Sequence, residues 1–291
     1  MSFIGSIVAI ITPFRDGKVD EPALRNLIEW QIADGTDGIV PCGTSGESAT
    51  LSHEEHNRVV ELTVQTVRRR VPVIAGTGSN STEEAIALTR HAKEVGADGA
   101  LLISPYYNKP TQEGLYLHHR AVAEAVDLPQ ILYNIPGRTA VNMTPQTVAR
   151  LSKVKNIVGI KEGAGSLQQV CDIIHLCSDR FTVLSGDDAL TLPMLAVGAK
   201  GVITVTANVA PADMAAMVDA WATGDTAKAR QIHYKLYPLF QALFLETNPI
   251  PVKHAVALMG KATAELRLPL CAMSQENLDK LTQVMKNLRL I

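Results

Sequence analysis

The chain has 291 residues, of which 46% are hydrophobic and 19% are charged. This composition is typical of a folded globular protein and excludes a disordered one. With 27 basic and 29 acidic residues, the formal net charge is −2, so the charge balance indicates no nucleic-acid partner. The apolar stretches are far shorter than the ~20 residues of a membrane helix, so no membrane partner is expected either. The four cysteines contain no Cys-x-x-Cys pair, which favours a reducing, cytoplasmic location.

Short apolar runs rich in Val and Ile recur along the first two thirds of the chain. Each run is too short for a helix and too apolar for a half-exposed strand, which indicates strands buried on both faces. The first run lacks the flanking basic residues and cleavage site of a signal peptide and is interpreted as a strand. The eight predicted strands are Ser6–Ile11, Gly38–Pro41, Pro72–Gly76, Ala100–Ser104, Gln130–Asn134, Ile157–Lys161, Thr182–Ser185 and Gly201–Thr204.

The segments between these runs carry signals for the ends of helices. Ser52 with Glu55, and Ser81 with Glu84, fit the capping box, in which serine and glutamate satisfy each other's exposed amides. Thr144–Pro145 places a capping residue before a proline at the first helical position. Two glycines stand where helices should end, at Gly96 and Gly198.

Alternating strands and helices predict an α/β fold with a parallel sheet, and eight units favour a closed (β/α)8 TIM barrel over residues 1–224. The alternative is an open parallel sheet. That fold would usually carry a GxGxxG turn after its first strand, where this chain has Thr12-Pro-Phe-Arg-Asp-Gly17.

The pattern changes after Gly224. Apolar residues recur there at helical spacing, first with an interruption at Pro238 and again near the end of the chain, and no further strand run follows. This predicts a C-terminal helical region over residues 225–291, packed against the barrel or against another subunit. The apolar residues are Leu236, Leu239, Phe240, Leu243, Phe244, Leu278, Leu281, Met285 and Leu288.

In a TIM barrel the active site lies at the C-terminal ends of the strands, and Lys161 ends the sixth predicted strand. Its side chain either points into the barrel mouth or is a solvated lysine at the rim. A free lysine has a pKa near 10.4, so only about one amine in a thousand is neutral near pH 7.5. A desolvated barrel mouth would lower that pKa and make Lys161 a nucleophile for Schiff-base chemistry.

Other polar residues also follow predicted strands. The glycines that bracket Gly43-Thr-Ser-Gly-Glu47 allow backbone amides to converge on a carboxylate, although a plain turn is the alternative. Tyr106, Tyr107 and Tyr133 are either proton-relay phenols, with a partner such as Thr44, or packing residues. Arg138 is either a bidentate carboxylate ligand or a solvated loop arginine.

No metal site is predicted. His53 and His56 share a helix face without the acidic partner of an HExxH motif. The pair His118-His119 is expected at the surface.

Taken together, three segments identify a family. They are Gly43-Thr-Ser-Gly-Glu-Ser48, Tyr133-Asn-Ile-Pro-Gly-Arg-Thr139 and Gly159-Ile-Lys-Glu162. The chain resembles the pyruvate-dependent class I aldolase and lyase family, most of all its dihydrodipicolinate synthase branch. The resemblance covers essentially the whole chain, from Gly5-Ser-Ile-Val-Ala9 through Pro105-Tyr-Tyr-Asn-Lys-Pro110 to Asn248-Pro-Ile-Pro-Val-Lys253.

The resemblance implies condensation of pyruvate with L-aspartate-4-semialdehyde, through a Schiff base on Lys161, in the diaminopimelate route to L-lysine. By it, Tyr133 shuttles protons with Thr44 and with Tyr107 of a neighbouring subunit. The pyruvate carboxylate lies on the backbone of Thr44 and Ser45. The residues implied to bind substrate are Thr44, Ser45, Arg138 and Ile203, with Arg138 on the carboxylate of the semialdehyde.

The resemblance also implies a homotetramer built as a dimer of dimers, and chemistry without a metal, flavin, pyridoxal phosphate or other cofactor. L-Lysine is expected as a feedback inhibitor. The residues that match the lysine pocket of inhibited members are Ser48, Ala49, His53, His56, Asn80, Glu84 and Tyr106.

Two positions depart from the family pattern, Ser45 where threonine is frequent and Gly163 where alanine is usual. Sialic acid lyases and keto-sugar acid aldolases would share the lysine and the tyrosine, but they do not usually place an arginine at the position of Arg138. A non-catalytic barrel that binds a keto acid is a further alternative. The joint presence of Lys161, Tyr133, Thr44 and Tyr107 argues against it.

Overall fold

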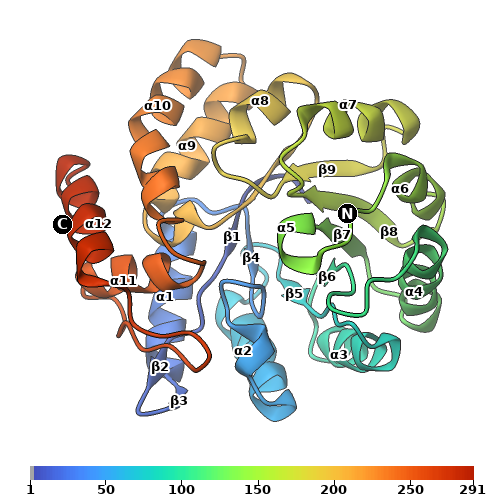
Figure 1. Ribbon diagram of the computed structural model, residues 1–291, viewed down its shortest axis with the longest axis horizontal. Helices are drawn as coiled ribbons and strands as arrows, with labels where there is room; N and C mark the ends of the chain where they lie inside the picture. The colour runs from blue at the N-terminus through green and yellow to red at the C-terminus, as the bar shows by residue number, and fades with distance from the viewer. Residues whose placement is uncertain (1–2) are drawn as a thin grey trace.

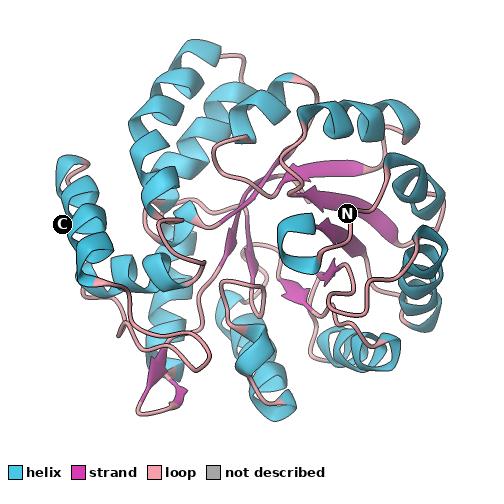
Figure 2. Cartoon of the chain, viewed as in Figure 1, coloured by secondary structure: helices cyan, strands magenta, loops and turns pink. Residues whose placement is uncertain are grey.

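Within residues 3–291, which the computed structural model describes, eight parallel strands form one central sheet (Figures 1 and 2). Their order is β4-β1-β10-β9-β8-β7-β6-β5, and a bridge between Ile39 and Val73 joins the two end strands. The sheet is therefore a barrel, and the predicted fold class is confirmed. The strands are β1 (Gly5–Ala9), β4 (Gly38–Val40), β5 (Ile74–Gly76), β6 (Gly99–Ile103), β7 (Gln130–Asn134), β8 (Ile157–Glu162), β9 (Thr182–Ser185) and β10 (Gly201–Thr204).

Helices surround the barrel, as Figure 1 shows. Between the strands lie α1 (Glu21–Ala33), α2 (His53–Val67), α3 (Thr82–Glu94), α4 (Gln112–Ala125), α6 (Pro145–Leu151), α7 (Leu167–Leu176) and α8 (Thr191–Ala196), and α9 (Pro211–Ala222) follows β10. Three shorter helices lie in the loops after strands, η1 (Ser48–Thr50), α5 (Pro136–Thr139) and η2 (Thr206–Asn208).

The C-terminal region is helical, with α10 (Thr226–Ala242), α11 (Ile250–Leu258) and α12 (Gln275–Asn287). In Figure 1, α12 lies at the edge of the molecule, and α11 lies between α12 and the barrel. The expected interruption at Pro238 is wrong, because α10 continues through this proline. A division of the chain into two domains after residue 224 stays a prediction.

The two predicted capping boxes form differently. In α2, the Ser52 side chain accepts from the Glu55 amide, and the Glu55 side chain accepts from the Ser52 amide. In α3, Ser81 caps the amide of Glu84, but the Glu84 carboxylate turns away, to His53 and the hydroxyl of Ser79. The second box is therefore only half formed, because tertiary partners compete for its glutamate.

Four residues separate β1 from a small hairpin of β2 (Phe14–Arg15) and β3 (Lys18–Val19), which was not predicted. Asp16 and Gly17 form its turn, and both have positive φ, 54° and 76°. That pair of angles matches the type I′ turn that an Asp-Gly sequence favours.

An irregularity in β8 decides which side chains enter the barrel. Gln130 of β7 pairs with Ile157, but the next residue pairs with Gly159, so Val158 is an extra residue in β8. Ile160 consequently packs outside the barrel, against the helices, while Tyr133 pairs with Lys161 and both lie on the inner side. Without the bulge, alternation would turn the lysine outward.

We predict that Gly159→Ala destabilises the barrel. A Cβ at this position would lie 2.5 Å from the carbonyl oxygen of Thr182 on the neighbouring strand. Such overpacking typically costs about 1–3 kcal/mol, so the midpoint of denaturant unfolding should fall. Gly137→Ala is the control, because a Cβ there meets no atom of the described chain within 4 Å. Equal midpoints for the two variants would contradict the prediction.

Candidate active site

Lys161 lies at the C-terminal end of β8, inside the mouth of the barrel. It is only 5% exposed, and its Nζ lies 4.3 Å from the centre of the Tyr133 ring on the adjacent strand. The barrel interior below it is apolar and contains Ile7, Ala9, Val40, Leu101, Leu184 and Ile203. The amine therefore lies in a largely desolvated position, as opposed to the solvated rim.

Burial lowers the pKa of Lys161 to about 8. The charge of Asp188 opposes this shift and that of Arg138 adds to it. At pH 7, a pKa of about 8 leaves about one amine in ten neutral, roughly two hundred times the neutral fraction of a free lysine at the same pH. Lys161 is thus prepared to attack a carbonyl carbon near neutral pH.

Tyr133 remains a protonated phenol under the same conditions. Burial raises its pKa to about 12, while the charge of Arg138 and a hydrogen bond with Thr44 act in the opposite direction. A buried phenol next to the amine can donate a proton to an oxygen that leaves the attacked carbon and later accept one back.

Asp188 is a functional candidate whose role the sequence did not indicate. It is 4% exposed and accepts hydrogen bonds from the amide and hydroxyl of Thr206, at 2.8 and 2.6 Å. Burial raises the pKa of this carboxyl. Its position in Ser185-Gly-Asp-Asp188, directly after a predicted strand, was the one signal in the sequence for a site residue. Two adjacent carboxylates are equally compatible with a weak cation site, so this signal did not define a role for Asp188.

The loop after β4 is closed by its own backbone. The amides of Gly46 and Glu47 donate to the carbonyls of Gly43 and Thr44, both at 3.1 Å. No acceptor within residues 3–291 is paired with the amides of Thr44 and Ser45. These two donors are therefore available to an anion at the barrel mouth.

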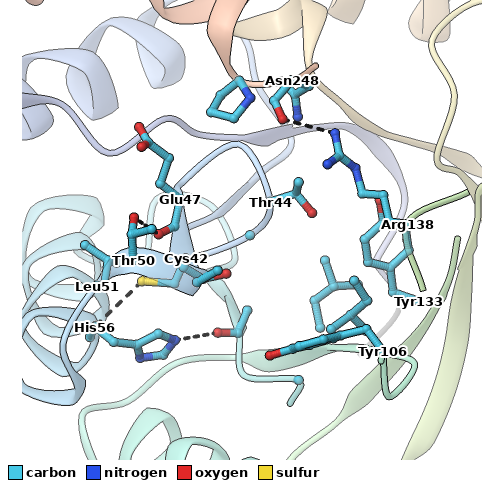
Figure 3. Close-up of a pocket in the computed structure, with 18 of the residues that line it drawn as sticks. Cys42, Thr44, Glu47, Thr50, Leu51, His56, Tyr106, Tyr133, Arg138 and Asn248 are labelled. Carbon is cyan, nitrogen blue, oxygen red and sulfur yellow. Dashed lines mark hydrogen bonds between the residues drawn. The ribbon is translucent and has the colours of Figure 1, made fainter. Parts of the chain in front are cut away.

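Asn248 connects this loop to Arg138 and was not predicted as a site residue. Its side-chain amide donates to the Ser45 hydroxyl at 3.1 Å. Its main-chain carbonyl accepts from Nη2 of Arg138 at 3.0 Å (Figure 3). Asn248 belongs to the segment Asn248-Pro-Ile-Pro, which the sequence singled out without giving it a role. The serine hydroxyl at position 45 thus has a protein partner, whereas its backbone amide has no acceptor among the described residues.

The residues behind the lysine form a polar network. Glu162 is 2% exposed and accepts from Asn134, Gln169 and the amide of Ala164. A Cβ at Gly163 would lie 3.2 Å from the carbonyl of Asn134. The network holds the turn after Lys161 in place although position 163 is a glycine.

Two cavities contain most of the predicted site residues. A small one, of about 40 Å³, is lined by Lys161, Tyr133, Thr44, Ser45 and Arg138, with Ile203 buried in the barrel core below. A larger one, of about 490 Å³, also includes Thr44, Tyr133 and Arg138 and extends between α2 and α3 (Figure 3). It is further lined by the predicted lysine-pocket residues Ser48, Ala49, His53, His56, Glu84 and Tyr106.

The predicted lysine-pocket residues differ in how they are held. Asn80 is outside the lining of this cavity, and its carbonyl accepts from Asn108. Glu84 is paired with His53 at 2.7 Å. His56 is buried, and its Nε2 lies 2.8 Å from the carbonyl oxygen of Gly76 (Figure 3).

Tyr107 is not brought to the site by its own chain. It is 90% exposed, and its φ of 70° lies in the left-handed region. His118 and His119, expected at the surface, are instead buried on α4. Across residues 3–291, no group of three or more His, Cys, Asp or Glu side chains is arranged to hold a metal ion, and no helix is long and apolar enough to cross a membrane.

Comparison with known proteins gives consistent matches. The model of the dihydrodipicolinate synthetase family matches residues 2–288. The 4-hydroxy-tetrahydrodipicolinate synthase of Syntrophus aciditrophicus is 64% identical over 289 residues, 99% of each chain. A crystal structure of the chloride-inhibited dihydrodipicolinate synthase from Acinetobacter baumannii, complexed with pyruvate, is 46% identical over the full length of both chains, with a TM-score of 0.98. The enzyme from Cyanidioschyzon merolae, solved with lysine bound, is 41% identical over 99% of each chain, with a TM-score of 0.97.

We predict that the reactivity of Lys161 rises with pH through a midpoint near 8. Only the neutral amine reacts, and burial lowers its pKa to about 8. Reductive methylation followed by peptide mass analysis would measure the rate, with exposed Lys228 as a reference in the same digest. Because the charge of Asp188 raises the pKa of Lys161, Asp188→Asn should move the midpoint to lower pH. A midpoint near 10, or no movement in the variant, would contradict this account.

Proposed function

The chain belongs to the dihydrodipicolinate synthetase family, and we propose on that basis that it condenses pyruvate with L-aspartate-4-semialdehyde in the diaminopimelate route to L-lysine. The observation that carries this proposal is the desolvated amine of Lys161, with its pKa lowered to about 8, beside the phenol of Tyr133. The curated relative at 64% identity carries the name of this synthase.

Lys161 attacks the keto carbon of pyruvate through its neutral amine. The oxygen of that carbon leaves as water after taking up protons, which Tyr133 is positioned to relay with Thr44. The protonated imine that results is an electron sink and allows the methyl carbon to lose a proton. The enamine so formed attacks the aldehyde carbon of the semialdehyde and makes the new carbon–carbon bond. The amino group of the semialdehyde then displaces Lys161 from the imine carbon and closes the ring.

The two carboxylates have separate ligands in this proposal. The unpaired amides of Thr44 and Ser45 hold the carboxylate of pyruvate, close to the lysine. Arg138 holds the carboxylate of the semialdehyde. One of its five donors is used by Asn248, and the guanidinium lines both cavities. Ile203 contributes to the apolar floor under pyruvate.

The proton relay is completed by a second copy of the chain. Tyr107 is the most exposed of the large hydrophobic side chains in the described part of the chain and has a strained, left-handed backbone. We assign it to the site of a neighbouring subunit, in a homotetramer built as a dimer of dimers. The four cysteines are free, which supports a cytoplasmic location.

L-Lysine is the proposed feedback inhibitor, bound in the part of the large cavity between α2 and α3. Glu84 offers a carboxylate for the ammonium group of the ligand. Tyr106 lies near Glu84, whose negative charge contributes to the raised pKa of the Tyr106 phenol. The cavity continues from there to Tyr133 and Arg138. The lysine-bound relative supports this assignment.

We predict that borohydride, in the presence of pyruvate, reduces a covalent adduct onto Lys161. Intact mass and peptide mapping would locate it. Arg138→Ala should still be trapped, because this arginine contacts the second substrate, while turnover of the semialdehyde falls by about ten- to a thousand-fold with the lost charge-assisted contact. Lys161→Ala is the control without the amine. An adduct on another lysine, or trapping that fails equally in Arg138→Ala, would overturn these assignments.

We predict that millimolar L-lysine inhibits the enzyme and that Glu84→Gln weakens the inhibition about 10- to 100-fold, since a hydrogen bond to a charged group contributes about 1.5–3 kcal/mol. The assay follows consumption of the semialdehyde at saturating pyruvate. Glu83→Gln is the matched control, because Glu83 precedes it on the same helix and is exposed. Inhibition that is equal in all three proteins would place the lysine site elsewhere.

A further inference from the structure

Helix α11 of the C-terminal region contacts the loop after β4 at two points. Asn248, just before the helix, bonds to the hydroxyl of Ser45. One turn into the helix, Nζ of Lys253 lies 2.5 Å from Oε1 of Glu47. Thr44 and its unpaired amide lie in the same loop, so the loop is tied to α11 on either side of Gly46. Both Glu47 and Lys253 belong to motifs of the sequence, but the proposed chemistry gives neither of these two residues a task.

The ion pair between Lys253 and Glu47 is fully buried. The two side chains are 0% and 1% exposed, and no other ion pair within residues 3–291 has both side chains so deeply enclosed. Nζ of Lys253 also lies 4.1 Å from the centre of the Phe14 ring. Burying two charges costs much solvation free energy, and apolar replacements of similar volume often stabilise a protein. Fold stability alone therefore gives no reason for this pair.

The remaining atoms of Glu47 are also fixed. Its second carboxylate oxygen accepts from the amide of Arg267 at 3.2 Å, and its own amide donates to the carbonyl of Thr44. Its φ is 52°, a left-handed conformation that a non-glycine residue adopts only when its surroundings hold it. Glu47 thus links α11, which its carboxylate contacts, to the carbonyl of Thr44, to which its backbone amide donates.

We propose that Lys253 and Glu47 are positioning residues that hold the amides of Thr44 and Ser45 at a fixed distance from Lys161. At this distance the carboxylate of a keto acid binds the two amides while its keto carbon lies at the amine of Lys161. Neither residue touches substrate. They fix the loop that does, through one ion pair across 206 positions of the chain. This inference rests on the proposed function for its ligand, pyruvate, but the rigidity of the loop is a property of the protein alone.

The test compares Glu47→Gln/Lys253→Met with the wild type. The double variant removes both charges at nearly constant volume, and the glutamine keeps an acceptor for Arg267. It should fold, whereas Lys253→Met alone would leave a buried carboxylate unpaired. Two quantities are measured, the pyruvate concentration that gives half-maximal borohydride trapping and the hydrogen exchange of amides in residues 43–50.

We expect half-maximal trapping to require about 10- to 100-fold more pyruvate, because small misplacements of binding groups have effects of this size. Amides in residues 43–50 should exchange faster, while those of β7 should not change. Leu281→Ala is the control, since it removes a fully buried side chain from α12, in the same helical region, without touching the ion pair. It should lower the unfolding temperature but leave trapping and loop exchange as in the wild type.

A double variant that differs from the wild type only in unfolding temperature would overturn the proposal and make the pair a structural contact. Failure of pyruvate to be trapped on the wild-type protein is a separate result, which contradicts the proposed function. The exchange measurement needs no pyruvate, so it tests the positioning role even if the wild-type protein is not trapped. Unchanged exchange in residues 43–50 of the double variant then refutes the positioning role, and faster exchange supports that role.

Discussion

A lysine amine enclosed at the top of an apolar barrel is the constraint on which the other parts of the site depend. Desolvation favours its neutral form, and the buried carboxylate of Asp188 limits that effect, so the pKa remains near the working range at about 8. The same burial keeps Tyr133 a phenol. One environment therefore supplies both the proposed nucleophile and the proposed proton donor. The inward direction of Lys161 follows from one extra residue, Val158, in β8.

The barrel supplies the reacting groups, and the C-terminal region supplies much of their alignment. Asn248 bonds to both Ser45 and Arg138, and Lys253 fixes Glu47. Arg267, in the loop after α11, binds the carboxylate of Glu55 with both of its terminal nitrogens and donates to the carbonyl of Thr50. Residues 45–55 are thereby held from outside the barrel. A loop made of small residues and glycine, which would be mobile alone, becomes a defined binding surface.

The sequence predicted the barrel well because its strands are continuous apolar runs that only a parallel sheet buried on both faces accommodates. It also predicted the strand-end position of the site, since this follows from topology. It did not predict the bulge at Val158, because one inserted residue leaves no trace in a run that is apolar throughout. Asp188 and Lys253 gain their partners from residues 18 and 206 positions away. Local patterns carry no information about such pairs, and family resemblance marks the motifs without giving their contacts.

The two Ser-x-x-Glu segments show where local rules end and function begins. Both sequences satisfy the capping box equally, and in α2 the glutamate returns to its cap while also binding Arg267. In α3 the corresponding Glu84 leaves the cap for Ser79, in the loop before the helix, and for His53 of α2, which lines the large cavity. A helix start loses part of its stabilisation there, and the cavity gains a carboxylate with a lowered pKa. Such a departure from the local preference is expected where a side chain serves a ligand, and it places a carboxylate where we propose that the ammonium group of L-lysine binds.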